Sequence, residues 1–513
     1  MTDQKRGPSR RAVVGGIGAA AVAGSFGLMA DEAFALPLKV RSDLASIAGK
    51  RMLGLYKKAV GLMLARGEWD PKSWYFQANI HSHPYLVDPQ GEGIQVKDEA
   101  RAIFNQTGAT ADLRTLALGA DGTGQDGVWN TCTHHRGYRE HFLSWHRLYL
   151  YHFENVIESV LGEPFALPYW NYTDPKSPAK RKLPKEFAKP VSGSNPLHFE
   201  DRAKSFLNNG LRIEDIRAKA TLKSSVYMDP PVNSEPSETG FNYEIDDQPH
   251  GQVHTRVGTP GKGMQSFELA ARDPLFWVHH AQIDRLWESW RRPRVTDGLS
   301  PARDPSDAAW LDREFTFAKP DGSPSIMKAR KSLQTKKELN YRYDTLQDVK
   351  LVTLAVAAGG PSQPVPSTTL SASATGTAAA ITAKEVPVPV DITPSLSTDA
   401  AKALIRKPSS QFMLVIGVEA KTNPGCVYDV FLKVKPNLNA PATEERFIET
   451  FNLFGAVHAG HGGHKPITWQ ADITDLVRAS KFDPTVPGQI IVKCRFEDPI
   501  GPAVIKSVTV EAR

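Results

Sequence analysis

Cysteines and long apolar segments are scarce in this sequence of 513 residues. Only three cysteines are present, Cys132, Cys426 and Cys494, which excludes a fold held together by a framework of disulfides. No apolar segment approaches the length of a membrane-spanning helix, so we expect no membrane insertion. The sequence also lacks a block of basic residues and a base-stacking motif, so its formal net charge of +6 does not indicate a nucleic-acid partner. The length predicts two or three domains with a large core.

The first 35 residues have the features of an export signal. Residues 9–13 (SRRAV) resemble a twin-arginine motif, and a moderately apolar segment rich in Gly and Ala follows them. Ala33-Phe34-Ala35 supplies the small residues of a cleavage site, so the mature chain is predicted to begin at Leu36. The twin-arginine route carries folded proteins. We therefore expect a bacterial protein that folds before export and is periplasmic or secreted.

The rest of the chain changes character along its length. Residues 36–300 have mainly helical patterns, including an amphipathic segment at 44–64. Residues 301–350 contain two short strand patterns and are predicted to form a small connecting domain. Residues 351–400 are rich in Pro, Ala, Ser and Thr, which predicts a linker.

The C-terminal part, residues 401–513, is predicted to be a β-domain. Evenly spaced strand patterns occur in it at 412–418, 427–434, 490–496 and 507–511. They favour a small antiparallel sandwich. Cys426 and Cys494 both lie in this domain and could pair in an oxidising compartment. The expected fold class is therefore mainly α, a helical bundle followed by a small β-rich domain.

Histidines gather in two places within the helical part. Five of them lie between His134 and His152. The aromatic residues Phe142, Trp145 and Tyr149 recur there at helical spacing, which places His146 on a helix with an aromatic inner face.

The second cluster lies about one hundred residues downstream. His250 and His254 are four apart, so both rings share one face of a helix. A further predicted helix carries His279 and His280. One buried histidine is usually a core residue, but three helices that each present inward histidines indicate a metal site. Sites made only of imidazoles suit copper or zinc.

At the motif level the chain resembles the type-3 copper proteins, which are tyrosinases, catechol oxidases and hemocyanins. Residues 142–154 (FLSWHRLYLYHFE) resemble the family's first copper signature, and residues 273–284 (DPLFWVHHAQID) resemble the second. Residues 77–81 (QANIH) resemble the first-ligand segment of plant polyphenol oxidases. Weaker similarity to the later plant domains covers 309–312, 339–343 and 427–431.

This resemblance implies two copper ions, copper A and copper B. The implied ligands of copper A are His81, a histidine near Cys132, and His146; those of copper B are His250, His254 and His280. His279 is then expected outside the ligand set. Asp284 lies one turn after His280 and is expected to orient its ring, since ligating imidazoles usually donate their other N–H.

The middle ligand of copper A has three candidates, because position 137, where the family usually has this histidine, is Gly. His134 is preferred because Cys132-Thr133-His134 resembles the unit in which fungal relatives form a thioether between cysteine and ligand. His135 is the second choice. His141 is expected to be a packing residue.

Three further positions bear on the reaction. Phe267 lies where plant catechol oxidases keep a phenylalanine that shields copper A. Asp246 lies four residues before His250, where plant relatives have a Glu that orders a water; it either plays that part or caps the helix. Gly251 replaces the Asn that strong monophenol hydroxylators often carry, which argues against that activity.

The function implied is the copper-dependent oxidation of o-diphenols to o-quinones, with small phenols and O2 as partners and water as the other product. One alternative is a tyrosinase that also hydroxylates monophenols. Another is a non-catalytic O2-binding protein. A di-zinc hydrolase is disfavoured, since such sites generally keep a carboxylate or an activating base among the ligands.

Overall fold

The computed structural model describes residues 37–512 apart from internal gaps, the longest of which cover 88–94, 97–108, 229–239, 348–367, 435–443 and 455–466. The predicted export signal lies outside the described residues. Among the helices that are described, none is long and apolar enough to cross a membrane.

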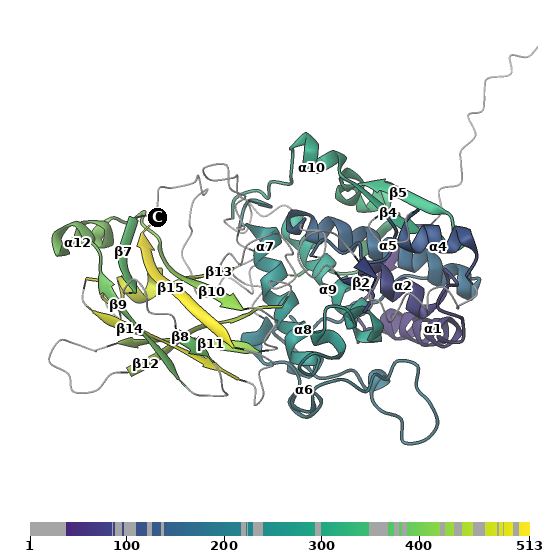
Figure 1. Ribbon diagram of the computed structural model, residues 1–513, viewed down its shortest axis with the longest axis horizontal. Coiled ribbons are helices and arrows are strands. Elements are labelled where there is room, and N and C mark those ends of the chain that lie inside the picture. The colour runs from purple at the N-terminus through teal and green to yellow at the C-terminus, as the bar shows by residue number, and fades with distance from the viewer. Residues whose placement is uncertain are drawn as a thin grey trace, which may run out of the picture. The chain divides into compact units, whose positions relative to one another are not determined.

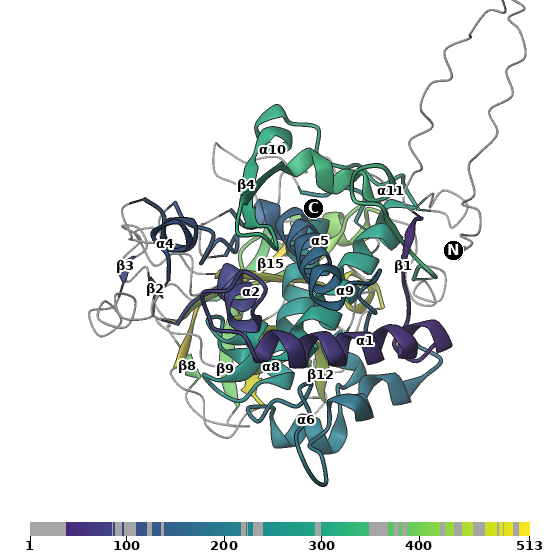
Figure 2. The same ribbon diagram turned by 90° about the vertical axis from the view of Figure 1, so that its right-hand side faces the viewer.

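Two long helices form the centre of the helical part, α5 (Phe142–Leu161) and α9 (Pro274–Arg291). They pack against each other, and the rings of Phe153 and Trp277 stack between them with centroids 3.4 Å apart. Helix α1 (Ile47–Leu64) packs against α5 (Figure 2). The shorter helices are α2 (Trp74–His81), α4 (Ala111–Leu118), α6 (Lys204–Asn209), α7 (Phe241–Ile245) and α8 (Gln252–Val257).

Local signals set the ends of these helices. Helix α9 begins with a proline at its first position, and the Asp273 carboxylate accepts a hydrogen bond from Leu275 N at 2.8 Å. Helix α5 ends at Gly162, whose φ of 71° lies in the left-handed region that glycine adopts readily. The start of α9 and the end of α5 therefore lie at residues whose local preferences favour a helix boundary.

The segment after α9 packs back onto the helical part. It contains α10 (Ala308–Asp312), β4 (Glu314–Ala318), β5 (Pro324–Lys328), α11 (Thr335–Glu338) and β6 (Tyr341–Tyr343). Strand β6 pairs in parallel with β1 (Lys39–Arg41), near the start of the described chain. Apolar residues of this segment join the core of the helical part. The described part of the predicted connecting domain, 301–350, therefore has no core of its own.

The described strands of the C-terminal part form one nine-stranded sheet (Figure 1). Its strands are β7 (Thr368–Ser373), β8 (Ala379–Ile381), β9 (Val388–Pro394), β10 (Phe412–Ala420), β11 (Val427–Val434), β12 (Glu444–Asn452), β13 (Ile467–Asp472), β14 (Gly488–Cys494) and β15 (Ala503–Ala512). They run in the order β12-β11-β14-β9-β7-β15-β10-β13, with β8 beside β15. All these pairs are antiparallel. Two short helices, α12 (Thr398–Arg406) and α13 (Thr474–Arg478), accompany the sheet.

Two sequence predictions for this part need correction. Residues 351–400 are not simply a linker, because β7, β8 and β9 lie within them and Leu370 is fully buried. Their small residues form strands because β15 and β14 pair with them. The antiparallel arrangement is confirmed, but the strands belong to one hydrogen-bonded sheet and the two-layer sandwich is not confirmed. The Cys426–Cys494 pair is a disulfide, as the sequence allowed.

Candidate metal centre

Two groups of buried donor side chains meet inside the helical part. His250, His254, His279 and His280 each place one ligand nitrogen within 4.8 Å of the others. In the second group, His81, Cys132 and His146 place their donor atoms within the same distance of one another. The groups adjoin, because the rings of His146 and His280 stack with centroids 4.4 Å apart and planes 14° apart.

Each group is assembled from separate elements. His81 is the last residue of α2, whose first turn is capped by Ser73 through a 3.0 Å bond from Phe76 N. His146 lies in the first half of α5. His250 lies in η6 (Asp246–Gly251), a π-helical turn that leads directly into α8, which carries His254. Helix α9 supplies the remaining two histidines, so five elements converge here.

Backbone contacts set the protonation of three rings. Nδ1 of His146 lies 2.8 Å from the Phe142 carbonyl oxygen, and Nδ1 of His254 lies 2.8 Å from the Met264 carbonyl oxygen. A carbonyl oxygen only accepts, so in each ring Nδ1 carries the proton and Nε2 offers a lone pair. His250 follows the same rule, with Nδ1 3.0 Å from the Asp246 carbonyl oxygen. These contacts prepare Nε2 of all three rings for a metal ion.

Burial keeps the rings neutral. It lowers the pKa of His146, His254, His279 and His280 well below the ordinary value, and repulsion from the neighbouring histidines adds to the effect. Nε2 of His254 and Nε2 of His280 are 3.2 Å apart, so both aim at one region. Buried, unprotonated imidazoles that face one another are the donor set of a metal site.

His134 is buried beside these groups but is not part of either. Its Nδ1 lies 3.6 Å from Cys132 Sγ, while its Nε2 lies 2.9 Å from the Asp246 carboxylate. Cys132 Sγ is also 3.8 Å from His146 Nε2. The cysteine is a free thiol, and its thioether with His134 remains a prediction. The alternative ligand His135 lies outside the described residues.

Asp246 contacts His134, His250 and an arginine. Besides His134, its carboxylate lies 3.0 Å from His250 Nδ1 and accepts a 3.1 Å bond from Arg139. Burial opposes its ionisation, but its contacts with His134 and with the Arg139 guanidinium hold the pKa of Asp246 well below its ordinary range. The sequence also allowed Asp246 to cap a helix, but among the described contacts its carboxylate makes no capping bond in η6. Nothing in the sequence marked Arg139.

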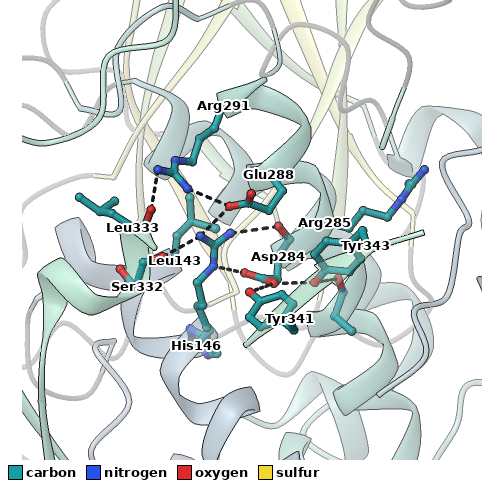
Figure 3. Close-up of polar contacts among 12 residues, drawn as sticks. Leu143, His146, Asp284, Arg285, Glu288, Arg291, Ser332, Leu333, Tyr341 and Tyr343 are labelled. Atoms are coloured by element: carbon teal, nitrogen blue, oxygen red, sulfur yellow. Dashed lines mark hydrogen bonds and ion pairs between the residues drawn. The ribbon is translucent and has the colours of Figure 1, made fainter. Parts of the chain in front are cut away.

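The predicted role of Asp284 is not borne out by its contacts. Its carboxylate accepts bonds from Tyr341 at 2.6 Å and from Arg41 at 2.9 Å, and it also pairs with Arg147. Figure 3 shows the Tyr341 and Tyr343 hydroxyls directed at this carboxylate. Nδ1 of His280 makes no hydrogen bond to any described residue. Asp284 therefore joins the helical part to β1 and β6 instead of orienting His280, because two buried arginines outcompete a neutral ring.

Aromatic side chains enclose the two groups. Phe267, 1 % exposed, has its ring centroid 4.7 Å from that of His81, which fits the predicted shield over the first group. Phe454 stacks on His254 at 4.3 Å with planes 16° apart and meets His250 edge-on at 5.7 Å. Phe454 follows strand β12, yet it belongs to the core of the helical part. No sequence signal identified this residue.

Polar contacts hold the end of β12 beside η6. Gln252 Nε2 donates to Thr450 Oγ1 at 3.1 Å, and Asn452 Nδ2 donates to the Asp247 carbonyl oxygen at 3.0 Å. A Cβ atom at Gly251 would lie 2.6 Å from Asn452 Oδ1. The absence of a side chain at position 251 therefore makes room for Asn452.

Known proteins match both the sequence and the fold. The family model for the common central domain of tyrosinase matches residues 71–236 and 201–293. The chain belongs to the tyrosinase and polyphenol oxidase family. A tyrosinase of Hahella sp. (strain CCB-MM4) is 26% identical over 449 residues, which are 83% of this chain and 88% of that protein. (+)-Larreatricin hydroxylase of Larrea tridentata is 28% identical over 60% of this chain, which spans about half (49%) of that plant protein.

Solved structures of the family share the fold. Latent apple tyrosinase superimposes with a TM-score of 0.54 at 21% identity, over 93% of this chain and 97% of that one. Latent aurone synthase gives a TM-score of 0.59 at 17% identity, over 93% and 90% of the two chains. Copper is the metal that membership of the tyrosinase family implies. The donors fit it, because neutral imidazoles suit both oxidation states and the thiol suits Cu(I).

Two other buried histidines of this tyrosinase-family chain, His141 and His152, pack as ordinary core residues. His152 stacks on Phe317 with centroids 4.7 Å apart, and His141 stacks on Trp310 at 4.9 Å. His279 was predicted to lie outside the ligand set. Its ring belongs to the second group, and its Nδ1 lies 2.9 Å from the Tyr172 hydroxyl. Its adjacency to His280 was the only signal for that position.

Proposed function

We propose that the chain is a catechol oxidase, which converts two o-diphenols to two o-quinones while one O2 becomes two waters. Each diphenol releases two electrons and two protons, so two of them supply the four electrons and four protons that O2 requires. The contact between the two donor groups, with His146 stacked on His280, carries this proposal. Copper-dependent oxidation of phenols in general follows from the family itself.

In this proposal copper A and copper B take the histidines implied by the sequence. Copper A has His81, His134 and His146, and copper B has His250, His254 and His280. When bound, the two copper ions supply the electron exchange between the phenol and O2. The chain presents unprotonated ring nitrogens, as the contacts of His146, His250 and His254 require. Its aromatic walls exclude water from these nitrogens.

Two positions favour diphenols over monophenols as substrates. Phe267 lies against His81 and narrows the approach to copper A. Gly251 offers no side chain to hold a water that could deprotonate a monophenol.

A second candidate is a tyrosinase that also hydroxylates monophenols. The bacterial relative that covers 83% of this chain is named a tyrosinase, which is the observation in its favour. The third possibility, an O2-binding protein without turnover, predicts binding of O2 with no consumption of phenol. We further propose small phenols as substrates and export by the twin-arginine route.

The intact chain is also proposed to be latent. Phe454 covers the copper B histidines that a phenol would have to approach, since its ring lies 4.3 Å from that of His254. A cut between β6 and β7 would separate the helical part from the β-domain that carries this residue. Activity should therefore rise when the chain is cut there.

Oxygen uptake by the copper-loaded chain tests these proposals. A protease site is inserted between β6 and β7, and uptake is measured with catechol and with phenol before and after cleavage. Uptake with catechol alone is the expected result, while uptake with both would establish the tyrosinase. If the chain binds two copper ions but takes up no oxygen with either substrate, the proposal that it is an oxidase is wrong. His152→Gln serves as a control, since it alters a buried histidine outside both donor groups.

A further inference from the structure

The carboxylate of Asp246 lies between the two predicted metal sites. One of its oxygens is 2.9 Å and the other 3.0 Å from Nε2 of His134, which belongs to the proposed copper A set. Oδ1 also lies 3.0 Å from Nδ1 of His250, which belongs to the copper B set. The rings of His134 and His250 are parallel, with planes 3° apart and centroids 6.1 Å apart. One buried side chain thus contacts a histidine of each site.

The charge on this carboxylate decides which nitrogens carry protons. Arg139 donates to Oδ2 through Nε at 3.3 Å and through a terminal nitrogen at 3.1 Å, so Asp246 is ionised. An ionised carboxylate can only accept hydrogen bonds. His134 must therefore carry its proton on Nε2, and His250 must carry its proton on Nδ1.

The positions of these protons determine which ring nitrogen of each histidine keeps a lone pair that can bind a metal ion. His250 retains Nε2, as do His146 and His254, whose Nδ1 atoms face backbone carbonyls. His134 is different, because its remaining nitrogen is Nδ1. That atom faces Cys132 Sγ at 3.6 Å, and the same sulfur belongs to the group of His81 and His146. The nitrogen left on His134 is thus directed toward the donors of the first site.

We propose that Asp246 is a positioning residue shared by both metal sites: it fixes His134 for copper A through Nδ1 and His250 for copper B through Nε2, with Arg139 as its counter-charge. This inference rests on the ligand sets in the proposed function. It replaces the two roles that the sequence suggested for Asp246, ordering a water or capping a helix. A carboxylate that holds the second N–H of a ligating histidine usually serves one metal ion. Here one carboxylate serves two, so its loss should weaken both sites together.

Copper titration of Asp246→Asn tests this. Asparagine keeps the shape but replaces one accepting oxygen by an NH2 donor and removes the charge that pairs with Arg139, so an N–H group then faces the donors that the carboxylate had accepted from. Removing such an outer carboxylate typically weakens metal binding by about 10–100-fold. We expect a loss of that size for both copper equivalents, measured against a competing chelator with a chromophore.

Asp247→Asn is the matched control. It removes a carboxylate from the same turn that lies 3.4 Å from the same arginine but is half-exposed, and it should leave both affinities close to those of the wild type. Wild-type affinity for both ions in Asp246→Asn, or a loss at one ion only, would overturn the shared role. An equal loss in Asp247→Asn would overturn it too. A wild-type chain that fails to bind two copper ions would instead refute the proposed function.

A measurement on the wild-type chain avoids the risk that Asp246→Asn fails to fold. Nitrogen-15 spectra of histidine-labelled, metal-free protein distinguish the two neutral tautomers. His134→Gln identifies the His134 signals by their disappearance. A proton on Nε2 of His134 is expected. A proton on Nδ1 of His134 would refute the assignment. This measurement also separates a positioning role of Asp246 from a purely structural one, because a residue that only stabilises the fold would not determine which nitrogen of His134 carries the proton.

Discussion

Gly251→Ala should activate the uncut chain without harming the helical part. Gly251 has φ −61° and ψ −31°, an ordinary helical conformation, so the backbone does not require glycine. What requires it is space, because the added Cβ would lie 2.6 Å from Oδ1 and 3.0 Å from Nδ2 of Asn452. Alanine is itself the better helix former by about 1 kcal/mol. The cost of the change therefore falls on the contact with β12.

The size of that cost follows from the contacts of Asn452. Its Nδ2 donates to the Asp247 carbonyl oxygen at 3.0 Å, and its Oδ1 accepts from Phe454 N at 2.9 Å. If the side chain is displaced, both bonds are lost, at about 0.5–1.5 kcal/mol each. A total of about 1–3 kcal/mol corresponds to roughly a 5- to 150-fold shift towards the undocked arrangement. Because Asn452 anchors Phe454, the same shift exposes His254.

Oxygen uptake with catechol by the uncut, copper-loaded chain measures this shift. Gly251→Ala should raise the rate towards that of the cut wild type, while the rate after cleavage stays unchanged. Asn452→Ala removes the obstructing amide, so adding Gly251→Ala in that background should have no further effect. An unchanged rate in Gly251→Ala, or an equal increase in both backgrounds, would refute the steric argument.

Three other changes have outcomes that the structure specifies. Asp284→Asn should lower the free energy of unfolding at pH 7 by about 3–5 kcal/mol, since it leaves two buried arginines underpaired. Burial opposes the ionisation of Asp284, but these arginines hold its pKa below the usual 3.8. The difference in unfolding free energy between variant and wild type, measured by denaturant titration, should therefore shrink as the pH falls below that range. Replacing both Cys426 and Cys494 by Ser opens a loop with a sequence separation of 68 and should lower the unfolding free energy of the β-domain by about 4 kcal/mol; equal denaturation curves for oxidised wild type and variant would contradict this. His280→Gln should reduce bound copper from two ions to one by elemental analysis, whereas His279→Gln should retain both; the reverse result would exchange their roles.

The sequence predicted best where one local pattern decides the structure. The amphipathic segment 44–64 corresponds to α1, Ile47–Leu64, and strand 427–434 has the predicted bounds. Prediction from the sequence failed where distant pairing partners determine whether a segment forms a strand. Strands β7 to β9 have small residues with weak preferences of their own, and they are strands because distant strands β14 and β15 bond to them.

Within the candidate site, the same division separates the histidines from their partners. Residues spaced four apart on a helix share a face, so the sequence alone brought His250 and His254 together, and the two copper signatures indicated His146 and His280. Asp284 shows the limit of such reasoning, because its position one turn from His280 suggested a contact that buried arginines prevent.

The sequence by itself determined that helices present a set of inward histidines, that such a set suits copper or zinc with a resemblance that implies copper, and that a β-rich domain follows. Only the tertiary structure decided which carboxylate serves which ring and what covers the site. Asp246 meets His134 across 112 positions of sequence, and Asn452 meets Asp247 across 205. Such contacts depend on how whole elements pack, because no periodicity within a segment carries information about a partner so far along the chain.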